Sequence, residues 1–298
     1  MEDKIKKLSN IYGLSQENFE IYYKKVLLIL KTGKKPSDTK TITIVGGQSG
    51  AGKTRLIPIA KQELGNNAVT VDFDELRSYH PHYKEVSDLY PEITHRILHA
   101  DTEKVKNAIL ENLRTEGYNV IYEGALRNTQ GFLDFAKEFK NDEYNIRMNI
   151  MAVPKLESYG STFVRYATDL LENINPRWVE KEAHDGSYEG VIRTVKAFID
   201  EQLTDDISVF TRGGEEGPKK IYSTKQRQFQ DASTAIEYGR EVGRKKAVLD
   251  FQIKYRTVRG ILEDKKPELL PRLTDWENLY KEESKYFGLN REEPKVDD

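Results

Sequence analysis

The sequence predicts an α/β fold of the P-loop NTPase type, a parallel sheet flanked by helices, with a helical region added at the C-terminal end. Between residues 41 and 225, short β-rich runs alternate with helical patterns, and a glycine-rich loop follows the first run. The last part of the chain is heavily charged, with apolar residues every three or four positions. We therefore divide the chain into an N-terminal helix and loop (1–40), a P-loop core (41–225) and a C-terminal helical extension packed on the core (226–298).

The composition excludes several classes of protein. The 298 residues include 47 Lys plus Arg and 49 Asp plus Glu, and this balance argues against a general binder of nucleic acids or membrane surfaces. The chain has no cysteine, which excludes disulfides and thiolate metal sites. The longest aliphatic run, VLLIL at 26–30, is too short to span a membrane, and the first residues lack the apolar stretch of a signal peptide. We expect a soluble, cytoplasmic protein.

Local patterns place the individual elements. Ser15 is a suitable N-cap for a helix over 15–31, where aromatic and aliphatic residues recur at helical spacing. A loop over 32–40 leads into the first strand. Strands are expected at 41–45, 68–73, 118–122, 146–153 and 206–210, and helices at 53–64, 92–116, 129–140 and 156–173.

The loop GGQSGAGKT (46–54) follows a predicted strand and opens a predicted helix, which is the context of a phosphate-binding P-loop. Its glycines let consecutive backbone N–H groups turn toward a polyphosphate, and the helix N-terminus adds positive potential. We expect Lys53 to bridge the outer phosphates of ATP and the Thr54 hydroxyl to hold Mg²⁺. The expected ATP-binding residues are Gly47, Gln48, Ser49, Gly50, Ala51, Gly52, Lys53 and Thr54.

Acidic residues follow two other predicted strands, at the edge where open α/β sheets bind their ligands. Asp72 and Asp74 follow the run AVTV, and Glu123 ends the run YNVIY. Phosphoryl transfer needs a carboxylate to accept the proton of the attacking hydroxyl, and a second one commonly positions Mg²⁺. We predict Asp74 as the base, with Glu123 and Asp72 positioning the metal or the substrate. The alternative for each acid is an N-cap or a solvated turn.

Two arginines and two histidines are further candidates. Arg165 lies on a predicted helix and Arg177 follows NINP in an expected hinge loop, so both are placed to neutralise charge on a transferring phosphoryl group. Plain solvent exposure is the alternative for each arginine. His95 and His99 have a four-residue spacing that can bind zinc on a helix, but Arg96 stands where a zincin motif requires glutamate.

Taken together, these motifs resemble those of the zeta toxin family, the kinase half of epsilon/zeta and PezA/PezT toxin–antitoxin systems. The resemblance implies a P-loop kinase that transfers the γ-phosphate of ATP to a hydroxyl of a UDP-amino sugar and so depletes a cell-wall precursor. In the best-known members this acceptor is UDP-N-acetylglucosamine. The motifs that carry the resemblance are GGQSGAGKT (46–54), DELRSYHPHY (74–83), GYNVIYEGALR (117–127), MAVPK (151–155), Arg165-Tyr166, Arg177 and IYST (221–224).

The resemblance also implies roles for individual residues. Lys53 and Thr54 match the phosphate and Mg²⁺ positions, and Asp74 matches the catalytic base. Arg165 and Arg177 match the arginines that clamp the ATP phosphates, so the catalytic candidates are Lys53, Asp74, Arg165 and Arg177. Candidate substrate contacts are Arg77, His80, Asn107, Glu123 and Arg127, although His80 is also expected to shape the loop beside Asp74.

Two positions depart from the family pattern on the acceptor side. Asn107 stands where members carry a substrate-contacting glutamate, and Ala125 stands where they carry threonine. An alanine has no hydroxyl, and an amide donates where a carboxylate only accepts. We therefore expect ATP chemistry to be retained, with an acceptor that differs from UDP-N-acetylglucosamine or is held differently.

The resemblance implies two partners, a nucleotide-sugar substrate and an antitoxin that contacts the N-terminal helix (15–31) and blocks the ATP side. We expect neither a membrane nor a nucleic acid as a partner. Two alternatives stay open for the function. One is a P-loop kinase of another acceptor, such as a different nucleotide sugar or a nucleic-acid 5′ end, and the other is a nucleotide-binding module without transfer chemistry.

Overall fold

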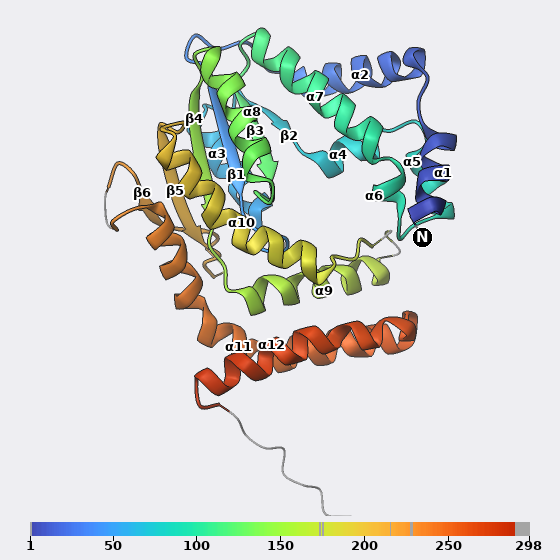
Figure 1. Cartoon of the computed structure of the whole chain (residues 1–298), viewed down its shortest axis with the longest axis vertical. Helices are drawn as coiled ribbons and strands as arrows, with labels where there is room; N and C mark the ends of the chain where they lie inside the picture. The colour runs from blue at the N-terminus through green and yellow to red at the C-terminus, as the bar shows by residue number, and fades with distance from the viewer. Residues whose placement is uncertain (1, 173, 175, 215, 227–228, 290–298) are drawn as a thin grey trace, which may run out of the picture.

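A single six-stranded sheet forms the centre of the protein (Figure 1). The computed structural model describes residues 2–172, 174, 176–214, 216–226 and 229–289. All neighbouring strands pair in parallel except the last two, so the predicted parallel sheet is confirmed with one added antiparallel edge. The strand order is β2 (Val69–Val71), β3 (Val120–Gly124), β1 (Thr41–Gly46), β4 (Asn145–Met151), β5 (Asp206–Thr211) and β6 (Lys219–Ser223).

Helices cover the two faces of the sheet unequally. β1 is buried at every position, and its side chains alternate between two apolar clusters, with Ile42 and Ile44 in the larger and Val45 in the smaller. The larger cluster includes residues of α2 (Gln16–Lys31), α7 (His99–Thr115), α8 (Thr129–Asn141), α10 (Lys181–Asp200) and the start of α11 (Ala232–Lys265). The smaller includes residues of the 3₁₀ turn η1 (Lys53–Leu56) and α3 (Ile57–Glu63).

The strand predicted at 68–73 is shorter in the structure, because β2 ends at Val71 and a helix begins at Phe73. Asp72 is the N-cap of α4 (Phe73–Ser78), because its Oδ1 accepts the backbone N–H groups of Asp74 and Glu75 at 2.7 and 3.2 Å. Asp74 therefore lies in the first turn of α4 and is oriented by that helix. The N-cap alternative that was open for Asp72 is the one the structure shows.

The helix predicted at 92–116 is two helices, α6 (Thr94–Ile97) and α7, separated at Leu98. Ile97 and Leu98 are buried in a small cluster with Leu8 and Tyr12 of α1 (Glu2–Tyr12) and with Val86 of α5 (Tyr83–Leu89). The need to bury both residues against an N-terminal helix explains the break. α1 was not predicted, whereas α2 begins as expected, with the Ser15 hydroxyl accepting the Asn18 N–H at 3.2 Å.

The C-terminal helices form a second apolar cluster with α9 (Lys155–Leu171), which lies between them and the sheet (Figure 1). Trp276 is only 1% exposed, and a Cβ on Gly160 would come within 2.4 Å of its ring. This close approach fixes α9 against α12 (Thr274–Tyr286), and η2 (Pro267–Leu273) adds Leu269 and Leu273 to the same cluster. Among the described residues, no helix is both long enough and apolar enough to cross a membrane.

Candidate active site

The glycine-rich loop connects β1 to η1 at the carboxyl end of the sheet, as the motif predicted. Gly47, Gly50 and Gly52 have φ angles of +153, +72 and +89°, which side chains rarely permit. At Gly50 a Cβ would lie 2.0 Å from the Ser158 carbonyl oxygen of α9. The loop therefore needs glycine both for its backbone conformation and for its contact with α9.

Gln48 belongs to the loop, but its side chain points into the protein. It is fully buried, and its amide donates to the Val153 carbonyl at 2.8 Å and to the Ser158 hydroxyl at 3.1 Å. The Gln48 side chain therefore anchors the loop to Val153 and to Ser158 of α9. Only its backbone is available for the ATP contact that the sequence predicted.

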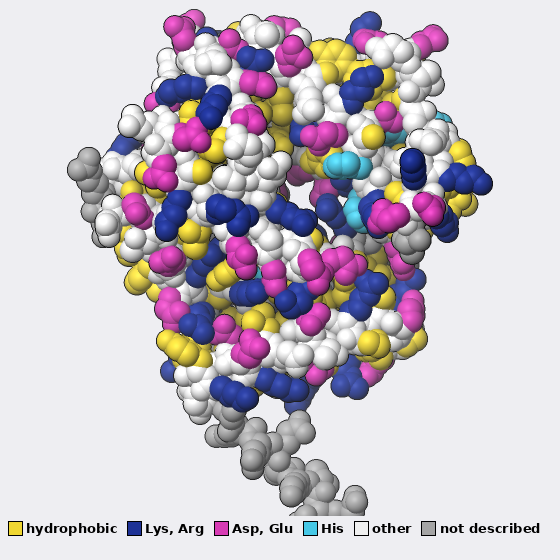
Figure 2. All heavy atoms as spheres, in the orientation of Figure 1, with side chains coloured by type: hydrophobic (Ala, Val, Ile, Leu, Met, Phe, Trp, Pro, Cys, Tyr) yellow, Lys and Arg dark blue, Asp and Glu magenta, His cyan; other side chains and the backbone are white. Residues whose placement is uncertain are grey.

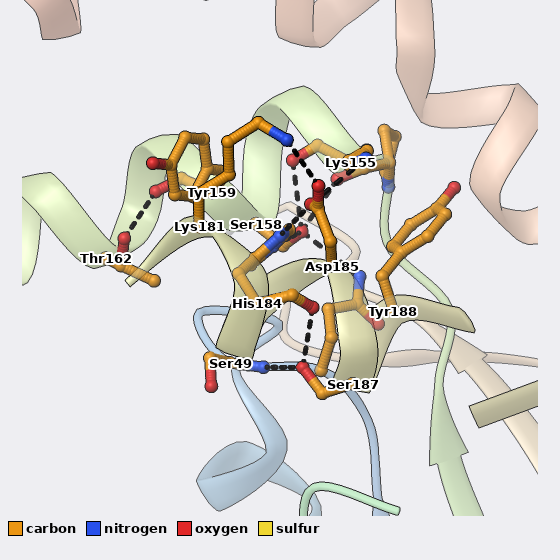
Figure 3. A network of polar contacts seen from close by, with 12 residues as sticks. Ser49, Lys155, Ser158, Tyr159, Thr162, Lys181, His184, Asp185, Ser187 and Tyr188 are labelled. Atoms are coloured by element: carbon orange, nitrogen blue, oxygen red, sulfur yellow. Dashed lines mark hydrogen bonds and ion pairs between the residues drawn. The ribbon is translucent and has the colours of Figure 1, made fainter. Parts of the chain in front are cut away.

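Behind the loop, a buried network joins α9 to α10 (Figure 3). The Ser158 hydroxyl lies 2.9 Å from Nε2 of His184, whose Nδ1 lies 3.3 Å from Asp185. Asp185 in turn pairs with Lys155 at 3.0 Å and Lys181 at 2.6 Å. Burial lowers the pKa of His184 to about 4, so the imidazole is neutral at pH 7.

The order Ser–His–Asp is that of a hydrolase triad, but the position of these residues excludes that role. Ser158 and His184 are both 0% exposed, so no substrate reaches the hydroxyl. The Ser158 hydroxyl also accepts a hydrogen bond from the Gln48 side-chain amide. The network is therefore a support that holds the phosphate loop in place, and Ser187 extends it by accepting the Ser49 N–H at 3.5 Å (Figure 3).

Lys53, Thr54 and Glu123 come together at the mouth of the loop. The Thr54 hydroxyl donates to Glu123 Oε2 at 3.2 Å, and Lys53 Nζ lies 3.9 Å from Glu123 Oε1. Burial raises the pKa of Glu123 above its ordinary value, although the Lys53 charge opposes this. Burial likewise lowers the pKa of Lys53, against the attraction of Glu123. Two oxygen groups and one cation thus converge where the outer phosphates of a nucleotide would lie.

Asp74 is held by two arginines. Arg77, one turn later in α4, donates to Asp74 Oδ1 at 2.6 Å, and Arg177 donates to Oδ1 and Oδ2 at 2.9 and 3.2 Å. Burial raises the pKa of Asp74, but the charges of Arg177 and Arg77 outweigh it, so the pKa lies below its usual value. Asp74 is therefore a carboxylate at neutral pH. Two residues of the NINP segment, Asn173 and Asn175, lie outside the described residues, so the predicted hinge there stays a prediction.

Arg165 projects from α9 and is exposed. Its positive charge contributes to lowering the pKa values of both Lys53 and Asp74. Figure 2 shows a hollow in the centre of this face, between α4 on one side and α9 and α10 on the other, with Lys, Arg, Asp, Glu and His side chains around it. The structure therefore brings Lys53 close to Glu123 and Asp74 close to Arg177, whereas one shared cleft for all four catalytic candidates stays a prediction.

A groove of about 640 Å³ runs between α7 and α8. Asn107 lines it, as does an aromatic group in which the ring of Tyr122 lies 5.1 Å from Phe135 and 6.1 Å from Phe132. Burial raises the pKa of Tyr122 to about 12, so its phenol is neutral. The groove also contains a residue pair that the sequence did not single out, Glu103 and Lys106, 2.5 Å apart on α7.

His80 and Arg127 are placed differently from the other candidates. The His80 side chain is fully buried, with Nε2 3.3 Å from Asp101 and Nδ1 accepting the His82 N–H at 3.1 Å, so it shapes the loop after α4. Arg127 is exposed and lies over α10, where a Cβ on Gly186 would be 3.1 Å from its Nε. A substrate contact stays a prediction for both residues.

Arg212 is a site residue that the sequence reasoning missed. It follows β5 directly, and its guanidinium donates to the Gly50 carbonyl of the loop. The signal was available, because Arg212 follows a predicted strand at the same sheet edge as Asp74 and Glu123. The zinc alternative receives no support, since among the described residues no three His, Cys, Asp or Glu side chains form a group that could hold a metal ion.

Comparison with known proteins decides the family. The model described as zeta toxin matches residues 27–227, more than half of the chain. The chain belongs to the zeta toxin family. Family members are kinase-like toxins of toxin–antitoxin systems, and the matched region contains the phosphate loop, α4, β3 and α9.

Individual zeta toxins are similar over most of their length. Toxin zeta of Streptococcus agalactiae is 28% identical over 246 residues, 82% of this chain and 84% of the relative. Toxin zeta of Enterococcus hirae is 30% identical over 217 residues, 72% of this chain and 74% of the relative. Toxin PezT of Streptococcus pneumoniae is 29% identical over 203 residues, 68% of this chain and 80% of the relative.

Solved structures confirm the fold of this zeta toxin family member. A chain from the PezAT chromosomal toxin–antitoxin system of Streptococcus pneumoniae has a TM-score of 0.72 at 24% identity, covering 84% of this chain and 99% of that one. The AvrRxo1-ORF1:-ORF2 complex with ATP has a TM-score of 0.57 at 13% identity, covering 88% of this chain and 89% of that one. A P-loop kinase fold is therefore shown.

Proposed function

We propose that this protein transfers the γ-phosphate of ATP to a sugar hydroxyl of a UDP-amino sugar, UDP-N-acetylglucosamine or a close relative. The observation that carries the proposal is the position of Asp74. Asp74 follows β2 and Lys53 follows β1, on the two sides of β3, whose Glu123 lies 3.9 Å from Lys53 Nζ. The α4 that carries Asp74 packs on α7 beside the groove. A donor site, a base and an acceptor groove therefore adjoin one another.

On the donor side, the chain provides charge and orientation. Residues 52–54 begin a helical turn, and the first N–H groups of a helix have no acceptor within it, so they are free to bind phosphate oxygens. Lys53 would neutralise the outer phosphates. Thr54 and Glu123 fit Mg²⁺, because a hydroxyl and a carboxylate oxygen 3.2 Å apart are the hard ligands that this ion takes beside phosphate and water. When bound, Mg²⁺ supplies positive charge to the phosphates.

On the acceptor side, Asp74 would take the proton of the attacking hydroxyl as the oxygen forms its bond to phosphorus. Arg177 occupies both carboxylate oxygens of Asp74 in this structure. The carboxylate keeps a free lone pair for the proton, and Arg177 would turn from it toward the phosphates when these bind. With Arg165, it would then neutralise charge on the transferring group.

The groove between α7 and α8 suits a hydroxylated ring. Aromatic side chains offer a flat apolar surface, and Glu103 and Lys106 offer an acceptor and a donor at its edge. The end that holds this pair adjoins the site, because Lys106 Nζ lies 5.8 Å from the ring of Phe73, next to Asp74. Glu103 stands one turn before Asn107, so a carboxylate is present although Asn107 is not one.

The antitoxin and the cellular location follow as further parts of the proposal. The solved PezAT structure comes from a toxin–antitoxin system, which supports an antitoxin partner. α2 offers it an apolar surface, with Ile21 and Leu28 exposed by 59 and 73%. We place the reaction in the cytoplasm, where ATP and nucleotide sugars are available, and its effect would be to deplete a cell-wall precursor.

The test is ³¹P NMR of the protein with ATP, Mg²⁺ and UDP-N-acetylglucosamine, beside an Asp74→Asn control. We expect a new phosphomonoester signal that is absent in the control. If ATP binds without this signal, a panel of other nucleotide sugars and a 5′-hydroxyl oligonucleotide tests the alternative acceptors. Binding without transfer to any of them would leave the nucleotide-binding module as the correct reading.

A further inference from the structure

Arg212 joins three parts of the site that are far apart in the sequence. From the end of β5, its guanidinium donates to the Gly50 carbonyl of the phosphate loop. It also donates to the Glu157 carboxylate at 2.9 Å and to the Ser161 hydroxyl at 3.0 Å, both on α9. The side chains of Arg212 and Glu157 are 23 and 20% exposed, so this is a shielded ion pair with defined geometry.

The contact with Gly50 fixes one peptide group of the loop. This peptide group consists of the Gly50 carbonyl and the Ala51 N–H. The Ala51 N–H donates to the Gln48 carbonyl at 3.1 Å. Because both ends of the group are bonded, its plane cannot rotate without breaking one of the two bonds. The N–H groups of residues 52–54, which follow directly, are thereby kept facing the phosphate position.

The contact with α9 fixes the helix that carries a catalytic candidate. Glu157, Ser161 and Arg165 are spaced by four residues each, so they share one face of α9. Arg212 holds the first two against the loop, and Arg165 lies on the next turn of the same face. The backbone that positions Arg212 is itself held, since the neighbouring Phe210 carbonyl accepts the Ala152 N–H at 2.7 Å.

We propose that Arg212 is a positioning residue that clamps the phosphate loop to α9, so that the loop and Arg165 keep one fixed arrangement. The clamp acts through three acceptors on two elements. A lysine would keep the charge, but its single ammonium cannot present the planar fork of a guanidinium to these acceptors. The catalytic part of this inference rests on the proposed kinase function, whereas the clamp itself does not.

The test compares Arg212→Gln and Arg212→Lys with the wild type and with Arg259→Gln, which removes an exposed arginine on α11. Hydrogen exchange is measured in the ATP-free protein for peptides covering 47–54 and 155–165, with β4 as the internal reference. We expect exchange in both segments to rise about tenfold in Arg212→Gln and to remain raised in Arg212→Lys. A rise that extends equally to β4, or none at all, would overturn the clamp.

The functional readout separates positioning from folding. We expect the affinity for a fluorescent ATP analogue to fall about tenfold in both Arg212 variants, and kcat per folded molecule to fall about tenfold, while KM for the acceptor stays the same. Full rescue by Arg212→Lys would show that charge alone matters and would overturn the proposal. If the wild type phosphorylates no acceptor, the proposed kinase function fails, and exchange and analogue binding still decide the clamp.

Discussion

Arg177 binds the carboxylate of Asp74 through one nitrogen, Nη1, at 2.9 Å from Oδ1 and 3.2 Å from Oδ2. The proposed mechanism needs both residues, one as the proton acceptor and one against the phosphates. Nη1 of Arg177 cannot bind the Asp74 carboxylate and the phosphates at the same time. The ATP-free arrangement is therefore a resting state in which each residue neutralises the other, and nucleotide phosphates would compete with Asp74 for Arg177.

This relationship predicts the pH dependence of Arg177→Gln. Arg177 lowers the pKa of Asp74, so its removal raises that pKa, and activity is lost at a higher pH as the solution becomes more acidic. The shift should occur in kcat/KM, which reports the free enzyme, and be smaller in kcat, which reports the complex where Arg177 has already moved. We also expect kcat to fall by about 10³-fold, as for other arginines that stabilise phosphoryl transfer.

The matched control for Arg177→Gln is Arg259→Gln, which removes an exposed arginine on α11. Both variants are measured from pH 3 to 9, with ATP well below its KM for kcat/KM and with ATP and acceptor saturating for kcat. An acid limb that stays in place in Arg177→Gln would show that Arg177 does not set the pKa of Asp74, and the resting-state interpretation would be wrong.

A second prediction concerns the acceptor groove. Glu103→Gln keeps the shape of the side chain but removes its charge, and hydrogen bonds to charged groups contribute about 1.5–3 kcal/mol. We therefore expect KM for the acceptor to rise about 10- to 100-fold while KM for ATP is unchanged. Glu111→Gln, which alters another groove carboxylate two turns further along α7, should have little effect.

The groove prediction has a rescue test. The double variant Glu103→Gln with Asn107→Glu moves the carboxylate by one turn along the same face of α7. Partial recovery of KM is expected if the groove needs one carboxylate near this place. An unchanged KM in Glu103→Gln alone would mean that the acceptor binds elsewhere.

The sequence predicted those parts of the site that depend on local order. The P-loop motif places Lys53 and Thr54 at the start of the helical turn after β1. Asp74 follows β2 and Glu123 lies at the end of β3, so these residues share one edge of the sheet. The Ser15 cap was equally readable. Each of these features is set within about ten residues of chain, which is the range over which patterns carry information.

The parts that were missed depend on contacts between distant segments. Arg212 reaches Gly50 across 162 positions, and although its place after a predicted strand marks it as a candidate, no local pattern shows which distant acceptors it contacts. Gln48 was expected to bind ATP as part of its motif. Its side chain is instead buried, where its amide donates a hydrogen bond to the Ser158 hydroxyl. The break at Leu98 arises because Ile97 and Leu98 are buried against α1, which is far from them in the sequence.

A third prediction concerns stability below neutral pH. Burial lowers the pKa of His184 to about 4 from an ordinary value of about 6.5, so between these values the unfolded chain takes up a proton that the folded protein does not. Stability contributed by the neutral imidazole is therefore present above pH 6.5 and is lost as the pH falls toward 4. The full shift corresponds to about 3 kcal/mol.

Urea unfolding at pH 7, 6, 5 and 4.5 measures this loss. His184→Gln should be less stable at pH 7 but should show a flatter dependence between pH 6.5 and 4. His82→Gln, at a side chain 38% exposed, is the control and should retain the slope of the wild type. Equal slopes in all three proteins would show that His184 does not control stability in this range.

The fourth prediction tests why the phosphate loop needs Gly50. Gly65 has a similar φ of +60° but open space around it, so Gly65→Ala isolates the cost of a left-handed backbone, about 1–2 kcal/mol. At Gly50 the same substitution also brings a methyl group within 2.0 Å of the Ser158 carbonyl, so the loop or α9 has to move. We expect Gly50→Ala to be the more destabilising by urea unfolding, and to be the only one of the two that weakens binding of an ATP analogue, by tenfold or more. Equal losses of stability with unchanged nucleotide affinity would mean that the loop does not depend on its contact with α9, and the support attributed to Ser158 would have to be abandoned.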